Sequence, residues 1–289
     1  MSAPQLISGL SDIADAYDVL LCDVWGVVHN GREPYPRAME ALTAYRQGGG
    51  AVVLISNAPR PGSDVIEQLD RIGVPRAAWQ AVTTSGDATI AELKKRAPGP
   101  AWAIGPERDQ GVYQGTGVTL TDKAEDAAFI SCTGLFDDEA DQPEDYRPTF
   151  REAARRGLEM VCANPDRVVH RGQDLIWCAG ALADVYAEEG GPVVMAGKPF
   201  GPIYDLALEQ AAGLLGRDVD RARVLCVGDG LPTDVLGANA QGLDCLFVAG
   251  GIHIADVTDA HGGLDPARAE ALLSEKGAHA RFVSLELNW

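Results

Sequence analysis

The stretch that decides the fold is "LLCDVWGVVHNG", residues 20–31. An apolar run that starts at residue 17 ends here at Asp23, and Gly26 follows three residues later. The run itself is typical of a buried strand, but an ionised carboxylate at its end does not belong in a core. In open parallel sheets, ligands bind beyond the carboxyl ends of the strands. Asp23 is therefore predicted to belong to a functional site at the edge of a sheet.

Short apolar runs rich in Val, Leu and Ile recur along the chain and alternate with helical patterns. The runs predict strands at 17–23, 51–57, 192–197, 222–229 and 244–250, and the helical patterns predict helices at 36–47, 63–73, 202–215 and 233–242. This alternation is typical of a parallel sheet that is covered on both faces by helices. The predicted fold class is therefore α/β, with a Rossmann-like core.

The middle of the chain has strand patterns of its own. Residues 101–105, 127–132 and 158–164 are predicted strands, and the acidic stretch 136–146 is predicted to be a solvated loop. We interpret this part as an inserted α/β unit. The predicted organisation is a discontinuous core domain, residues 1–83 and 192–289, interrupted by an α/β cap domain, residues 84–191.

Composition restricts the possible functions. The 289 residues carry a formal net charge of −18, which disfavours nucleic acid as a partner, because phosphate backbones are bound by basic surfaces. No apolar run approaches the ~20 residues of a membrane span. The six cysteines form no CxxC pair and lie mostly in apolar surroundings, which indicates buried thiols in a reducing compartment. The first 18 residues lack a basic region followed by an apolar stretch. We therefore expect a cytoplasmic protein without a signal peptide.

Polar residues follow four of the predicted core strands. They are Asp23, the pair Ser56-Asn57, Lys198 and Asp229. If these strand ends meet at one edge, the carboxylates of Asp23 and Asp229 repel each other unless a cation lies between them. Mg²⁺ suits this position because it prefers hard oxygen ligands and also bridges to phosphate oxygens. Asp234 opens the next predicted helix and is a candidate to hold a metal-bound water.

The same residues predict a site for an anionic substrate. Ser56 and the backbone N–H groups after it precede a helix N-terminus, which favours anions. Lys198 would neutralise further substrate charge. Asp23 is then predicted to be a nucleophile for an electrophilic phosphorus, because a cation and an ammonium group offset the repulsion between carboxylate and phosphate.

Four segments resemble, in order, the motifs of the haloacid dehalogenase superfamily of hydrolases, and in particular its class IIA, NagD-like members. They are "LLCDVWG" (20–26), "VLISN" (53–57), "GKPFGPIY" (197–204) and "VGDGLPTDVLGANAQG" (227–242), of which the last two are the most specific. The insertion lies between the second and third motifs, where class IIA members carry a cap. Within it, "CANPD" (162–166) resembles a recurrent cap segment of this class.

The resemblance implies Mg²⁺-dependent hydrolysis of phosphate esters through an aspartyl-phosphate on Asp23. It also implies metal binding by Asp23, Asp229 and the backbone carbonyl of Trp25. The phosphate would be held by Ser56, Asn57 and Lys198.

Trp25 departs from the family pattern. That pattern is Asp-x-Asp-Gly, in which the second Asp protonates the leaving oxygen and later activates water. The indole N–H is a donor that does not titrate, and general acid–base help is worth ~10²–10⁴ in rate. Unless another residue replaces it, we expect a preference for leaving groups that need no proton, such as aryl or acyl phosphates.

Four residues are weaker candidates on the substrate side. His29 titrates near neutrality and is a candidate base, although the pattern favours a structural or exposed histidine. Arg60 is a candidate substrate contact, and a salt bridge explains it equally well. Asn164 and Asp166 lie on either side of a proline and are more often turn formers.

The leading hypothesis is a Mg²⁺-dependent phosphatase for a small phosphorylated metabolite, such as a sugar phosphate or a nucleotide. Two alternatives remain. One is a non-catalytic or sensory homologue that binds metal and phosphate, and the other is a phosphotransferase with a long-lived phospho-aspartate. Class IIA relatives often dimerise through the cap, so a homodimer is possible by analogy.

Overall fold

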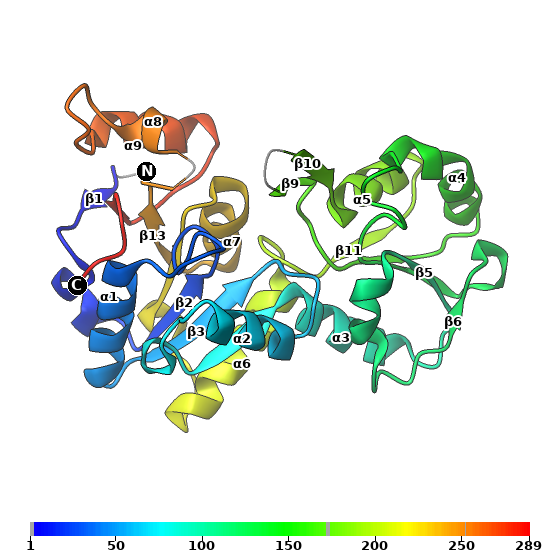
Figure 1. The fold of residues 1–289 in the computed structure, drawn as a ribbon, viewed down its shortest axis with the longest axis horizontal. Coiled ribbons are helices and arrows are strands. Elements are labelled where there is room, and N and C mark those ends of the chain that lie inside the picture. The colour runs from blue at the N-terminus through cyan, green and yellow to red at the C-terminus, as the bar shows by residue number, and fades with distance from the viewer. Residues whose placement is uncertain (1–2, 172–173, 252) are drawn as a thin grey trace. The chain divides into compact units, whose positions relative to one another are not determined.

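The computed structural model describes residues 3–171, 174–251 and 253–289, which divide into two units (Figure 1). The first unit contains residues 1–56, 65–83 and 198–289, and the second contains residues 57–64 and 84–197. Each unit has a parallel sheet and its own apolar core, and each is described by itself below.

The sheet of the first unit has seven strands among the described residues, in the order β1-β14-β13-β12-β2-β3-β4. Its strands are β1 (Gln5–Leu6), β2 (Val19–Asp23), β3 (Ala51–Ser56), β4 (Ala81–Thr84), β12 (Val224–Gly228), β13 (Asp244–Val248) and β14 (Phe282–Ser284). The successive pairings from β1 through β14, β13, β12 and β2 to β3 are parallel. Every residue of β2 and β12 is buried, as expected for central strands covered on both faces.

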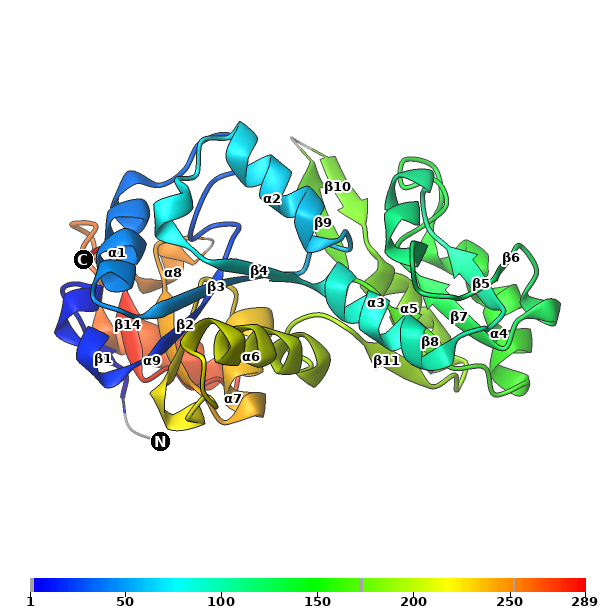
Figure 2. The same ribbon diagram turned by 90° about the horizontal axis from the view of Figure 1, so that it is seen from below.

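Helices cover both faces of this sheet (Figure 2). The helices α1 (Pro36–Gln47) and α2 (Gly62–Arg71) lie on one face, and α6 (Gly201–Leu215) and α7 (Leu236–Gln241) lie on the other. Proline in the first turn of α1 and α6 suits a position whose N–H has no helical partner. The remaining elements are α8 (Ile254–Val257), α9 (Pro266–Glu275), a π-helical turn (Leu231–Val235) and 3₁₀ turns at Leu10–Asp12, Ala14–Ala16, Arg76–Ala78 and Arg221–Arg223.

The second unit is built on a five-stranded sheet in the order β11-β8-β7-β5-β6, with parallel pairings throughout. Its strands are β5 (Ala101–Ile104), β6 (Leu120–Thr121), β7 (Phe129–Cys132), β8 (Met160–Cys162) and β11 (Val193–Met195). The antiparallel hairpin of β9 (Val168–Arg171) and β10 (Asp174–Trp177) stands beside it. The helices are α3 (Ser85–Arg96), α4 (Arg147–Arg155) and α5 (Ala179–Glu188), with 3₁₀ turns at Glu107–Tyr113, Ala124–Asp126 and Pro143–Tyr146.

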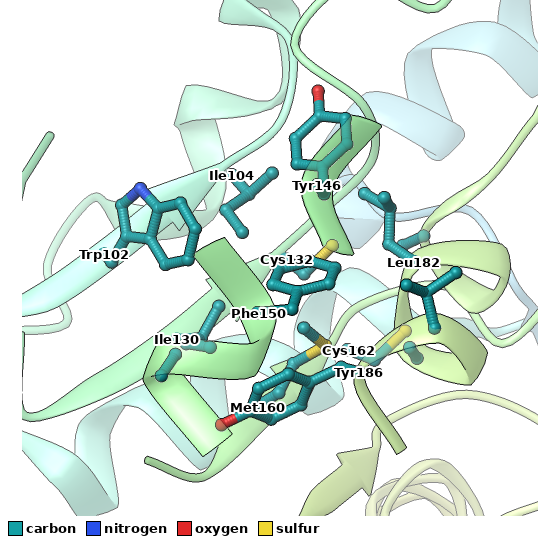
Figure 3. Packing of buried hydrophobic residues seen from close by; sticks show 14 of the residues in the cluster. Trp102, Ile104, Ile130, Cys132, Tyr146, Phe150, Met160, Cys162, Leu182 and Tyr186 are labelled. Carbon is teal, nitrogen blue, oxygen red and sulfur yellow. The ribbon is translucent and has the colours of Figure 1, made fainter. Parts of the chain in front are cut away.

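Alternation along the strands of the second unit builds two apolar layers, because successive side chains point to opposite faces. One layer contains Trp102, Ile104, Ile130, Cys132, Met160 and Cys162, packed against α4 and α5 (Figure 3). Phe150 of α4 lies in this layer, with ring centroids 6.0 Å from Trp102 and 5.3 Å from Tyr186. The alternate residues Ala101, Phe129 and Val161 pack with Leu93 of α3 on the other face.

The α/β fold predicted from the sequence is confirmed, and most predicted elements appear within a few residues of their expected bounds. The segment 192–197 differs, because β11 pairs with β8 of the second unit and not with a core strand. Residues 57–64 also group with the second unit. The two observed units therefore differ from the predicted core and cap boundaries at these two places.

All six cysteines are buried thiols. Burial raises the pKa of each thiol for which a shift is resolved; these are Cys22, Cys132, Cys162, Cys226 and Cys245. Among the described residues, no helix has the length and apolar character needed to cross a bilayer.

Candidate active site

Three buried carboxylates meet at the carboxyl edge of the first unit's sheet. Asp23 is the last residue of β2, and Asp229 directly follows β12, which pairs with β2. Asp234 lies in the π-helical turn that follows. One oxygen of each carboxylate lies within 4.8 Å of the others, and each residue is at most 7% exposed. The structure thus brings these three predicted site residues together.

Lys198 joins two of these carboxylates. Its Nζ donates to Asp23 Oδ1 at 2.6 Å, to Asp234 Oδ1 at 2.7 Å and to the carbonyl oxygen of Ile55 at 3.3 Å. The other oxygen of Asp234 accepts the N–H of Gly230 at 3.0 Å. Lys198 is only 3% exposed, so solvent screens the contacts of its ammonium group little.

Burial and charge set the protonation of this cluster. The pKa of Asp23 is raised to about 8. Burial is the largest cause, and the charge of the neighbouring Asp234 adds to it, whereas the charge of Lys198 lowers the pKa. Burial alone would lower the pKa of Lys198, but Asp23 and Asp234 raise it above its ordinary value. Lys198 is therefore charged in this cluster, where it lies among three acidic side chains.

Two glycines allow the chain to approach Asp229. A Cβ on either Gly26 or Gly251 would collide with the Asp229 carboxylate, and Gly26 also has a φ of +86°. Gly26 belongs to the recognised motif. Gly251, in the loop after β13, was missed, and the only available signal was its place after a strand that neighbours β12.

The two predicted phosphate-binding residues are assigned to different units. Ser56 ends β3, next to the carbonyl of Ile55 that Lys198 contacts. Asn57 groups with the second unit, where its Nδ2 donates to Asp166 Oδ1 at 3.2 Å. A Cβ on Gly197, which precedes Lys198, would lie 2.6 Å from Asn57 Oδ1.

Trp25 and His29 belong to the loop after β2 and make an edge-to-face contact, with ring centroids 5.3 Å apart. Trp25 is 59% exposed, whereas His29 is 2% exposed. His29 Nδ1 accepts the N–H of Gly31 at 2.8 Å, and burial lowers the pKa of the ring. A buried ring that already accepts a backbone hydrogen bond suits a structural histidine, and the role of His29 stays a prediction.

The other weak candidates all lie in the second unit. The backbone carbonyl of Arg60 accepts a hydrogen bond from Thr84 Oγ1 at 2.7 Å. Burial raises the pKa of Asp109, and the charge of the Arg60 guanidinium acts to lower it. Asn164 is 7% exposed, and its Oδ1 accepts the N–H of Asp166 at 3.0 Å. Asn164 is therefore a turn former, as such residues beside proline commonly are.

Comparison with known proteins places the chain in a family. The sequence profile of the haloacid dehalogenase-like hydrolases matches residues 20–119, and a HAD-hydrolase-like profile matches residues 195–272. A solved hydrolase of the haloacid dehalogenase-like family from Brucella suis 1330 is 42% identical, covers 98% of this chain and 100% of its own, and has a TM-score of 0.82. The chain belongs to the haloacid dehalogenase-like hydrolase family.

The relatives of this hydrolase include named phosphatases. D-glycerol 3-phosphate phosphatase of Mycobacterium tuberculosis is 28% identical over 85% of this chain and 67% of its own length. Ribonucleotide monophosphatase NagD of Escherichia coli K12 is 25% identical over 83% of this chain and 90% of its own. A solved glycerol phosphate phosphatase from M. tuberculosis, in complex with calcium, is 25% identical with a TM-score of 0.63 and covers 89% of this chain and 76% of its own. The predicted resemblance to class IIA, NagD-like members is confirmed.

The carboxylate cluster has the chemistry of a divalent-cation site. It offers hard oxygen donors on three side chains within reach of one ion. The excess of negative charge over the single Lys198 favours a cation there, and the raised pKa of Asp23 shows the cost of ionising the group without one. The residues present therefore fit a divalent metal ion.

Proposed function

We propose that this hydrolase is a Mg²⁺-dependent phosphatase that acts on a small phosphorylated metabolite through an aspartyl-phosphate on Asp23. The coarser assignment, a phosphoric monoester hydrolase of the HAD type, is supported by its named relatives. The observation that carries the finer proposal is the buried cluster in which Asp23 Oδ1 is held by Lys198 beside Asp229 and Asp234.

In this proposal, Asp23, Asp229, Asp234 and the backbone carbonyl of Trp25 hold the Mg²⁺ ion, with Asp234 acting directly or through water. When bound, the ion supplies positive charge that offsets the repulsion between the nucleophile and the phosphate. The hard oxygen donors suit Mg²⁺, which prefers such ligands. Gly26, the residue after Trp25, lies against Asp229, which supports the Trp25 carbonyl as a ligand.

Asp23 is the proposed nucleophile. Its free carboxylate oxygen forms a bond to phosphorus, and the bond between phosphorus and the leaving oxygen breaks with its electron pair on that oxygen. Lys198 keeps the carboxylate oriented and neutralises phosphate charge, together with donors on Ser56 and Asn57. Water then attacks the phosphorus and releases phosphate and Asp23.

In this proposal the leaving group departs with little protonation, because the Trp25 indole does not titrate and burial lowers the pKa of His29. We therefore propose that aryl and acyl phosphates are hydrolysed faster than alkyl phosphates. Substrate selection is assigned to the second unit, as the proposed cap, with Arg60, Asn164 and Asp166 as weak candidates. A cytoplasmic homodimer stays part of this proposal by analogy with class IIA relatives.

The test is a pre-steady-state and steady-state assay with p-nitrophenyl phosphate and Mg²⁺. Asp23→Asn should abolish both the burst and the turnover, while the exposed Asp122→Asn, a matched change of charge in the second unit, should keep both. Trp25→Asp should restore a proton donor and raise the rate on glycerol 3-phosphate by about 10²-fold, the lower range of acid–base help.

Two other outcomes identify the alternatives. A burst of nitrophenol followed by stalling, with transfer to added alcohols, would assign a phosphotransferase. Binding of Mg²⁺ and phosphate by calorimetry, without a burst or turnover on any ester tried, would overturn the enzyme and favour a binding or sensory protein.

A further inference from the structure

Trp25 is the most exposed of the large hydrophobic residues in the described part of the chain, at 59%. Its neighbours in the same loop, Val24, Val27 and Val28, are all buried. An isolated exposed hydrophobic residue is ordinary on a protein surface. This one lies two residues after the proposed nucleophile, where the family pattern has an acid that contacts the leaving oxygen.

The indole is held in place from two sides. His29 meets it edge-on, with an angle of 77° between the ring planes. Gly31, with a φ of +90°, lies so close to the outer atoms of the indole that a Cβ on it would collide with the ring. His29 is itself fixed by the N–H of Gly31. A ring that is already ordered loses little conformational entropy when a ligand packs on it.

The loop also fixes the backbone of Trp25 beside the acidic cluster. The backbone of Trp25 pairs in a β-bridge with His29, and the next residue, Gly26, lies directly against the carboxylate of Asp229. The residue that carries the exposed indole is therefore anchored next to the site that contains Asp23 and Lys198.

We propose that the Trp25 indole is a binding surface for the leaving group, and that the preferred substrates are phosphate monoesters of a hydroxyl on a flat aromatic ring. This inference rests on the proposed phosphatase function. Two properties of one residue favour the same substrate class. An indole stacks on planar rings, and it donates no proton, so the leaving oxygen must depart unprotonated, as a phenol-type oxygen does.

The proposed step is balanced without a general acid. The Asp23 oxygen forms the bond to phosphorus, and the bond from phosphorus to the ring oxygen breaks with its electron pair on that oxygen. The product is a phenolate stacked on Trp25, with its charge spread over its ring. Water then cleaves the aspartyl-phosphate, and its proton passes to the phosphate or the phenolate.

The first test compares two substrates whose leaving groups both depart without protonation. They are p-nitrophenyl phosphate, which carries a ring, and acetyl phosphate, which does not. Trp25→Ala should lower the ratio of kcat/KM for the ring substrate over the ringless one by about 3- to 10-fold, the range of an aromatic contact, mainly through KM. Trp25→Phe should keep the ratio within about threefold, because it retains an aromatic face. All three proteins lack an acid at this position, so acid catalysis does not enter the comparison.

A second measurement does not depend on turnover. Calorimetric binding of phenylphosphonate and methylphosphonate, with Mg²⁺ present, should show a several-fold preference for the ring compound in the wild type and Trp25→Phe but none in Trp25→Ala. Trp289→Ala, which removes an exposed tryptophan at the C-terminus, is the matched control and should leave the preference unchanged.

The inference is overturned if the wild type binds both phosphonates equally, or if Trp25→Ala keeps the full preference. Trp25 would then only cover the loop at Gly31. If both phosphonates bind with the expected preference but no ester is hydrolysed, the binding surface stands and the proposed phosphatase function fails.

Discussion

Lys198 contacts two members of the carboxylate cluster, Asp23 and Asp234. Removing one member of a buried ion pair leaves the other charge without compensation, which typically costs ~3–5 kcal/mol. Lys198 therefore has a structural role in addition to its proposed contact with phosphate.

Replacing Lys198 with Met should destabilise the first unit by roughly 3 kcal/mol where Asp23 and Asp234 are both ionised, because two buried carboxylates then lose their partner. The pKa of Asp23 is raised to about 8, so its ionised form, which needs the partner, accumulates as the pH rises through about 8, and the loss should be larger at pH 9 than at pH 7. Urea unfolding at pH 7 and pH 9 measures this. The same loss at both pH values would contradict the charge argument, and the exposed Lys123→Met is the control.

Single residues were predictable where a strand pattern fixed their place. Asp23 and Asp229 follow apolar runs that the sequence reveals, so their meeting could be expected. The bond from Asn57 to Asp166 could not, because it joins positions 109 residues apart and a local pattern does not say which distant side chains meet. The roles of the individual site residues stay predictions until variants are measured.

At the scale of elements, β2 carries the proposed nucleophile at one end and an ion-pair cluster at the other. Asp18, just before β2, binds Arg217 beyond α6 at 2.5 Å and Arg223, just before β12, at 2.8 Å. These contacts tie together the starts of the two strands whose other ends carry Asp23 and Asp229.

Asp18→Asn should cost roughly 1 kcal/mol at pH 7, because both arginines are partly exposed and solvent screens their charge. Hydrogen bonds from Arg223 and Arg217 lower the pKa of Asp18 to about 2. The stabilisation by these ion pairs is therefore fully present at pH values above the ordinary pKa of an aspartate, and it is lost as the pH falls through about 2. Thermal unfolding of both proteins between pH 2 and pH 7 should show curves that converge at the acidic end, and parallel curves would exclude the ion pair as the cause.

Elements with a strong period were predicted well, as α1 shows, since both of its observed ends match the expected 36–47. The segment 192–197 shows the limit. Its apolar pattern indicates a strand, but pattern alone does not say which sheet the strand joins, and β11 pairs with β8. Long-range pairing is set by packing that a local pattern does not contain.

At the scale of the whole molecule, the two units have separate cores, so their unfolding need not be one transition. Phe150 is fully buried in the second unit, between Trp102 and Tyr186. The acidic cluster lies entirely in the first unit. Each unit can therefore be perturbed by a change that leaves the other untouched.

Phe150→Ala should destabilise the second unit by about 3–5 kcal/mol, the usual cost of removing a buried aromatic ring. Mg²⁺ should raise the unfolding temperature of the first unit by mass action. This rise should be the same in the wild type and in Phe150→Ala. Calorimetry with and without Mg²⁺ separates the two effects. A Mg²⁺ shift that disappears in Phe150→Ala would show that the units unfold together.

The buried thiols have a practical consequence for such experiments. Three of them, Cys22, Cys226 and Cys245, belong to the first unit, and Cys132, Cys162 and Cys178 belong to the second. A thiol must reach solvent and ionise before it reacts, and both steps are blocked while its unit is closed. The rate at which an alkylating reagent labels each cysteine-containing peptide then measures how often the unit that contains it opens. The protein therefore contains, in each unit, native cysteines whose labelling reports local opening without an added probe.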